Sequence, residues 1–225
     1  MAVEVRTTPT RANVGDVVNP AANTAREQIA ANQILDWTLR GFVFTGGAVL
    51  MDATDIASVT SIADTTPDYV LQSPLGTATV VIPLRVRCSV TNDGGGLTVF
   101  DLVYTKAKQE TATALAFTSG TALKIQNNYT PNPMATSKSS LEYTVTSAAL
   151  TNVDTAVIAH AHMVDAGLTT GLIQLNEVFD YSFQDSPIAL TEGAALLLYT
   201  STTGGAGKTR ATFTWAELPR DVYVP

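Results

Sequence analysis

The sequence is poor in charged residues, and this limits the classes of partner that the chain can bind. Asp, Glu, Lys and Arg make up 15% of the 225 residues, against about 25% in typical globular proteins. The 13 Lys and Arg residues are outnumbered by 20 Asp and Glu residues, which gives a net charge of −7. A broad nucleic-acid footprint needs clustered Lys and Arg. We therefore expect no direct nucleic-acid partner.

Cysteine and long apolar runs are also scarce. Cys88 is the only cysteine, so an internal disulfide is excluded. It falls among alternating apolar residues, and we interpret it as a small buried hydrophobe rather than a reactive thiol. No apolar run reaches the roughly 18 residues that span a bilayer, and residues 1–6 do not resemble the start of a secretory signal. We expect no membrane partner and a chain that folds in a cytoplasm.

What the sequence does contain is a long series of short segments in which apolar and polar residues alternate. Residues 80–90 are the clearest, since alternate positions are apolar from Val80 to Val90, with Ile82, Leu84, Val86 and Cys88 between them. Such alternation predicts a strand with one buried face and one exposed face. We predict further strands near residues 42–44, 48–51, 68–72, 97–105, 123–129, 141–145, 155–164, 173–183, 194–201 and 211–218. Gly46-Gly47 predicts a hairpin turn, and residues 92–96 predict another turn.

The spacing of these segments indicates the fold class. Helical interludes of 10–15 residues do not separate them, which argues against a parallel βαβ fold. We predict an all-β protein, an antiparallel jelly-roll-like β-sandwich with an extended N-terminal arm and one short N-terminal helix. Lipocalin-like barrels and immunoglobulin-like sandwiches remain alternatives. The expected divisions are an arm with a helix over residues 20–37 inside residues 1–40, the sandwich over 41–218 and an extended tail over 219–225.

Two histidines form the most interesting chemical pattern. His160 and His162 flank one alanine, so a strand would place both imidazoles on one face. A metal site needs further ligands, and Asp154, Asp165 and Glu177 are the candidates. No spacing in the sequence requires any of them to be near the pair. We therefore favour a solvent-facing or subunit-interface pair over a metal site, and predict no metal and no cofactor.

The glycine-rich segment at residues 204–209 resembles a phosphate-binding loop only superficially. The P-loop motif requires a glycine at position 202, where this chain has Thr202, and a helix after the loop, where this chain has an alternating strand pattern. No G-x-S-x-G nucleophile elbow is present either. We predict that the chain is not an enzyme.

The polar arm and the extended tail are better suited to contacts with neighbouring subunits. A surface with little charge is weakly protected against association, and extended arms add contacts over long distances. The candidate interface residues are Arg6, Arg11, Arg26, Trp37 and Tyr223.

Five stretches carry a likeness to a known class of proteins. They are residues 24–44, which end in LRGFVF, residues 69–76 (YVLQSPLG), 79–84 (TVVIPL), 187–199 (PIALTEGAALLLY) and 211–219 (ATFTWAELP). Together they resemble jelly-roll-like bacteriophage virion structural proteins. The resemblance implies a capsid-associated protein of the virion, assembled in the host cytoplasm, that forms a homo-oligomer, most often a trimer. Its partners would be other capsid proteins of the same virion. The resemblance carries over no functional residue.

The leading hypothesis is therefore a structural protein that binds or stabilises a phage capsid, as a decoration, cement or minor capsid protein. A single-jelly-roll major capsid protein is an alternative, less favoured because the arm is almost neutral. A receptor-binding or carbohydrate-binding module of a tail or head fibre is another, although Phe117 is almost the only aromatic residue in the predicted long loops. A cupin-like metalloenzyme built on His160 and His162 is the least favoured.

Overall fold

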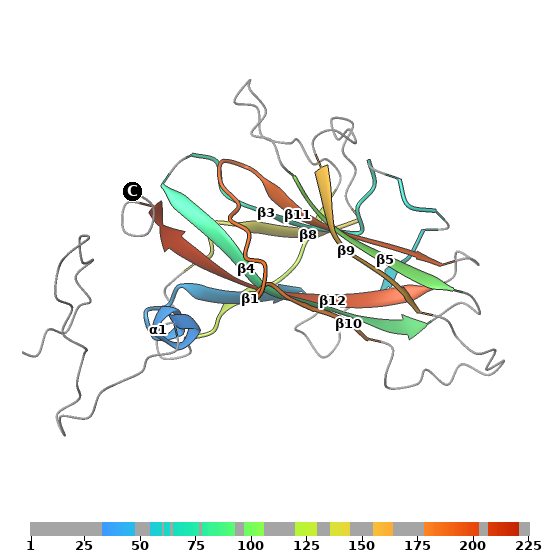
Figure 1. The fold of residues 1–225 in the computed structure, drawn as a ribbon, viewed down its shortest axis with the longest axis horizontal. Coiled ribbons are helices and arrows are strands. Elements are labelled where there is room, and N and C mark those ends of the chain that lie inside the picture. The colour runs from blue at the N-terminus through green and yellow to red at the C-terminus, as the bar shows by residue number, and fades with distance from the viewer. Residues whose placement is uncertain are drawn as a thin grey trace, which may run out of the picture.

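Two antiparallel β-sheets packed face to face form the body of the protein (Figure 1). The structure is a computed structural model that describes residues 33–47, 55–59, 61–63, 65–76, 78–92, 97–105, 120–129, 136–144, 155–163, 178–202 and 207–220. The prediction of an all-β sandwich with one short helix is confirmed for these residues. Their elements are α1 (Gln33–Leu39), β1 (Val43–Gly47), β2 (Ile56–Ala57), β3 (Tyr69–Gln72), β4 (Thr79–Asn92), β5 (Thr98–Thr105), β6 (Thr121–Ala122), β7 (Ile125–Asn127), β8 (Ser140–Tyr143), β9 (Thr155–Met163), β10 (Val178–Ser182), β11 (Ala195–Thr202) and β12 (Lys208–Pro219).

The pairing of the strands is nested, which means that strands early in the chain pair with strands late in the chain, from the outermost pair inward. The first sheet, called the β12 sheet below, runs β10-β4-β12-β1-β7, with β2 also paired to β12. The second, the β11 sheet, runs β6-β8-β3-β11-β5-β9. Within them β1 pairs with β12, β3 with β11, β4 with β10 and β5 with β9, all antiparallel. Each early strand of the chain thus has a late strand as its partner.

The three short strands between β5 and β9 extend this arrangement. Strand β7 joins the β12 sheet beside β1, whereas β8 joins the β11 sheet beside β3 and carries β6 on its other side. The segment therefore crosses from one sheet to the other and widens both on the same side.

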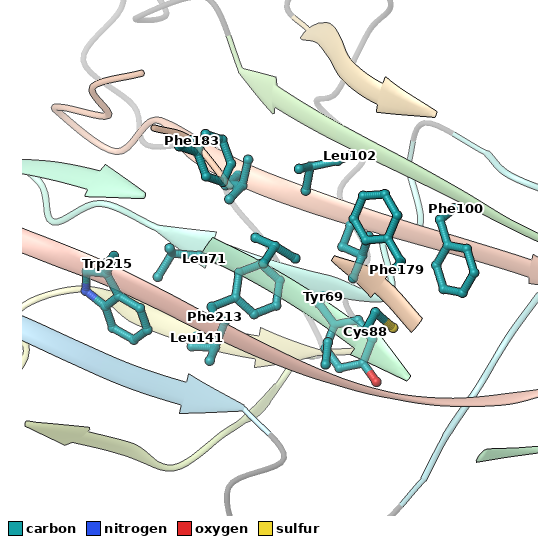
Figure 2. Packing of buried hydrophobic residues seen from close by; sticks show 14 of the residues in the cluster. Tyr69, Leu71, Cys88, Phe100, Leu102, Leu141, Phe179, Phe183, Phe213 and Trp215 are labelled. Atoms are coloured by element: carbon teal, nitrogen blue, oxygen red, sulfur yellow. The ribbon is translucent and has the colours of Figure 1, made fainter. Parts of the chain in front are cut away.

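Aromatic side chains from both sheets interlock in the core (Figure 2). Phe100 of β5 stacks on Phe179 of β10 with ring centroids 5.5 Å apart. Tyr69 of β3 lies 6.3 Å from Phe213 of β12, centroid to centroid. Each pair joins one sheet to the other, and such aromatic pairs add about 0.5–1.5 kcal/mol beyond the area that they bury.

The prediction that one face of residues 80–90 carries all the alternate apolar residues is wrong for the first half of the strand. The register between β4 and β12 shifts, so that Arg85 pairs with Thr214 but Pro83 pairs with Trp215, and Leu84 is left without an opposite residue. This extra residue is a β-bulge. Because of it, the side chains of β4 that precede the bulge point to the opposite face from the one expected by simple alternation. Val81 therefore lies in the main core together with the later half of the strand, while Ile82 and Leu84 pack on the outer face.

The predicted turn at Gly46-Gly47 is also wrong, because both glycines belong to β1 as its last two residues. A Cβ atom on Gly47, whose φ is +119°, would lie 2.2 Å from the carbonyl oxygen of Ala211. A Cβ atom on Gly46 would lie 2.8 Å from the Leu141 side chain. Gly47 thus allows close approach of β12 within the same sheet, and Gly46 leaves room for Leu141 of β8 in the opposite sheet. Close approach of this kind is a common role of glycine in strands.

Helix α1 packs on the outer face of the β12 sheet (Figure 1). Its end has the hydrogen bonds of a Schellman motif, from Phe42 N–H to Trp37 C=O and from Gly41 N–H to Thr38 C=O, with Gly41 at φ +76°. The helix ends two residues later than predicted, and residues 20–32 of the predicted helix lie outside the described residues. Among those described, no helix is long and apolar enough to cross a membrane.

Candidate functional site

His160 and His162 lie side by side on β9, the last strand of the β11 sheet. Their rings meet edge to face with centroids 4.4 Å apart, and the two Nε2 atoms are in direct contact. The Nδ1 atom of His160 pairs with Oδ1 of Asp101 on the neighbouring strand β5. About half of the His160 side chain is exposed, at 49%, so the group is open to solvent.

The register of the β5–β9 pair brings these three side chains together. Asp101 lies directly opposite His160, and Val99 lies opposite His162. Between them on β9, Ala161 packs against the main core, so the two histidines point to the outer face of the sheet. Sequence reasoning missed Asp101, although it is the only charged residue of the predicted strand 97–105 and could have been noticed on that ground.

Within the described part of the chain, no group of three or more His, Cys, Asp and Glu side chains is arranged to hold a metal ion. The three carboxylates considered from the sequence, Asp154, Asp165 and Glu177, lie outside the described residues. The described site therefore consists of two imidazoles and the carboxylate of Asp101, which contacts Nδ1 of His160.

The candidate interface residues are only partly covered by the structure. Arg6, Arg11, Arg26 and Tyr223 lie outside the described residues. Trp37 is buried in a small cluster with Val43, Ala216 and Leu218, on the outer face of the β12 sheet. Its indole is thus used inside the chain, where it holds α1 against the sheet, and it offers little surface to a partner.

Two further interpretations from the sequence are confirmed. Cys88 is completely buried in the main core, and this burial raises the pKa of its thiol. A strand, β12, begins at Lys208, at the end of the glycine-rich segment 204–209, where a phosphate-binding loop requires a helix. The amide of Gly207 donates a hydrogen bond to the Thr202 hydroxyl at 3.1 Å, which joins β11 to the start of β12.

A buried carboxylate, Asp68, lies just before β3. Its Oδ2 atom accepts hydrogen bonds from the backbone amide of Thr200 at 2.5 Å and from the Thr200 hydroxyl at 3.0 Å. That hydroxyl also lies 3.1 Å from the hydroxyl of Ser58. Burial raises the pKa of Asp68 to about 7, and the bonds from Thr200 only partly offset this.

A second buried carboxylate, Glu217, fixes the loop before β8 to strand β12. It accepts hydrogen bonds from the Ser137 hydroxyl (2.5 Å), the amides of Lys138 (2.8 Å) and Ser139 (3.1 Å), and the indole N–H of Trp215 (3.1 Å). Four donors thus replace the water that this carboxylate would otherwise bind. The arrangement is complete without a ligand, which indicates a structural role.

Comparison with protein-family models, with curated proteins and with solved structures finds no significant match to this chain.

Proposed function

We propose that the chain is a structural virion protein with a jelly-roll sandwich, which oligomerises and binds or stabilises a phage capsid as a decoration, cement or minor capsid protein. The observation that carries the proposal is the nested strand pairing of the two sheets. The step from fold to function is an analogy at the level of the fold, and the sequence resemblance to phage virion proteins points in the same direction.

The jelly-roll assignment rests on the order of the eight principal strands. A jelly roll is one long antiparallel hairpin rolled into two sheets, so that its first strand pairs with the eighth, the second with the seventh, the third with the sixth and the fourth with the fifth. Here β1, β3, β4 and β5 are the first four, and β9, β10, β11 and β12 the last four. The observed pairs are β1·β12, β3·β11, β4·β10 and β5·β9. All four agree with the jelly-roll scheme, and viral capsid domains are among its best-known members.

The surface supports an assembly role. On α1, Leu35 and Leu39 are 55% and 58% exposed, and their spacing of four residues places them on one face of the helix. On β9, Val157 is exposed as well. No other described strand pairs with the outer edge of β9, so its backbone groups can bind another chain. Contacts with further subunits would cover such groups.

Electron microscopy of the purified full-length chain, without a tag, tests the proposal. We expect discrete oligomers of uniform size, with a trimer as the leading expectation. Closed shells formed by the chain alone would support the single-jelly-roll major capsid protein instead, which is the alternative that the same strand order favours. Particles no larger than one 23.7 kDa chain, at every protein concentration, would contradict self-assembly.

A paired variant locates one of the contacts. Replacing Leu35 and Leu39 together by Gln removes the exposed apolar face of α1, and surface substitutions of this kind usually change stability by less than about 0.5 kcal/mol. We expect smaller assemblies with an unchanged melting temperature. Leu75→Gln is the matched control, because Leu75 is an exposed leucine in the turn between β3 and β4. Equal assembly of the double variant and the wild type would exclude the face of α1 as a contact.

A further inference from the structure

We propose that His160 and His162 form a binding site for one divalent transition-metal ion of the Zn²⁺, Ni²⁺ or Cu²⁺ class, with Asp101 as the residue that positions His160. The inference does not depend on the proposed function, since it rests on the geometry of β5 and β9 alone.

The carboxylate decides which nitrogen of His160 is available. Asp101 contacts Nδ1, so the ring proton lies there and Nε2 carries the free lone pair. A carboxylate on the remote nitrogen is the arrangement found behind histidines that bind metals, where it fixes the tautomer, orients the ring and raises its basicity. Asp101 comes from the adjacent strand directly opposite His160, so the sheet itself maintains this contact.

The second histidine directs its own Nε2 to the same point. The Nε2 atoms of His160 and His162 face each other, and the rings lie at 78° to one another. Zinc binds imidazole nitrogen at about 2.0–2.1 Å, so two nitrogens around a tetrahedral ion lie about 3.3 Å apart. A small rotation of the two exposed side chains gives this spacing, and the ion then takes the place of the direct contact between the two Nε2 atoms.

Imidazole selects the class of the ion. Nitrogen ligands of this type suit Zn²⁺, Cu²⁺ and Ni²⁺, whereas Mg²⁺ and Ca²⁺ prefer oxygen ligands. Two protein ligands leave the remaining coordination positions to water, because the described residues offer no third side chain. The site is therefore an open one on the outer face of the β11 sheet.

The chain has few other side chains that could bind these ions in a titration. His160 and His162 are its only histidines, and its one cysteine is buried. Tag-free full-length protein, treated with EDTA and dialysed, is titrated with Zn²⁺ and with Cu²⁺ by isothermal calorimetry. We expect saturable binding of one ion per chain, and electron paramagnetic resonance of the Cu²⁺ complex with coupling to two nitrogens.

Variants separate the role of each residue. We expect His160→Gln and His162→Gln to weaken binding at least tenfold each, and Asp101→Asn to weaken it about 10- to 100-fold, as is typical when the partner of a metal-binding histidine is changed. Asp180→Asn is the matched control, since Asp180 is a surface carboxylate in an ion pair with Arg85 on the other sheet. We expect it to bind metal like the wild type.

Two results would overturn the proposal. One is the absence of saturable binding in the wild type, and the other is equal binding by a variant that lacks both histidines. Binding that is unchanged in Asp101→Asn would remove the positioning role of Asp101. Melting curves of every apo variant show whether it is folded, so a loss of binding is attributed to the site only where the apo melting temperature is retained.

Discussion

Asp68 makes the stability of the sandwich depend on pH in the direction opposite to that of most carboxylates. Its side chain is buried beside β3 and β11, and only the amide and hydroxyl of Thr200 donate to it among the hydrogen bonds of the described residues. No described cation forms an ion pair with it. Burial raises its pKa from 3.8 to about 7, so the folded protein binds the proton more tightly than the unfolded chain does.

The sign of the effect follows from this difference. Tighter proton binding by Asp68 stabilises the folded protein. This contribution is fully present below pH 3.8, the pKa of Asp68 in the unfolded chain, and is lost as the pH rises to about 7. A change of pKa of this size corresponds to about 4 kcal/mol at most. Part of this loss takes place between pH 3.8 and pH 5. Between pH 5 and pH 8 we therefore expect the free energy of unfolding to fall by about 3 kcal/mol.

Asp68→Asn tests the reasoning, because Asn is neutral throughout and its carbonyl oxygen can still accept from Thr200. Urea unfolding of the variant and the wild type is measured at pH 5, 6, 7 and 8. We expect the variant to gain about 3 kcal/mol relative to the wild type between pH 5 and pH 8. Taking the difference between the two proteins removes the contribution of all other titrating groups.

The control is Asp180→Asn. The Arg85 guanidinium beside Asp180 lowers the pKa of that carboxyl, so its small contribution is present above pH 3.8 and lost as the pH falls. The Asp180→Asn variant should therefore be slightly less stable than the wild type at pH 8 and equally stable in strong acid. A constant difference between Asp68→Asn and the wild type from pH 5 to pH 8 would refute the reasoning, as would a difference that changes in the opposite direction.

Three further changes test other parts of the structure. Glu217→Ala leaves the amides of Lys138 and Ser139 and the Trp215 indole without their acceptor, so we expect a loss of about 3 kcal/mol or more in urea unfolding; unchanged hydrogen exchange at the two amides would contradict the role of Glu217. Gly47→Ala forces a Cβ atom against the Ala211 carbonyl, whereas Gly76→Ala meets nothing within 4 Å, and both have positive φ. We therefore expect Gly47→Ala to lower the melting temperature clearly more than Gly76→Ala, and equal effects would show that contact with β12 is unimportant. Deletion of residues 1–19 removes none of the described contacts, so we expect an unchanged melting temperature with smaller assemblies by light scattering, and a loss of folding would contradict the interpretation of this segment as an arm.

The sequence predicted the class of the fold because alternation of apolar residues reports directly on the two faces of a strand. It did not predict the bulge at Leu84, since an extra residue in one strand is defined only by the partner strand. The glycines of β1 were misread for a similar reason. Their need for close approach to Ala211 and Leu141 depends on neighbours that lie far away in the sequence.

The candidate site shows the same limit. The spacing of His160 and His162 correctly placed both rings on one face of one strand, which is a local property. Asp101 lies 59 positions earlier in the chain and becomes their neighbour only through the register of β5 and β9. The partners of Asp68, and those of Glu217 other than Trp215, are likewise distant in sequence, so pattern analysis could not distinguish these buried carboxylates from surface ones.

The most direct test of the central claim is the mass of the full-length chain in solution, measured by size-exclusion chromatography with light scattering over a range of concentrations. We expect a discrete species whose mass is a small multiple of 23.7 kDa, with three copies as the leading expectation. A monomer of 23.7 kDa at all concentrations would contradict an oligomerising virion protein.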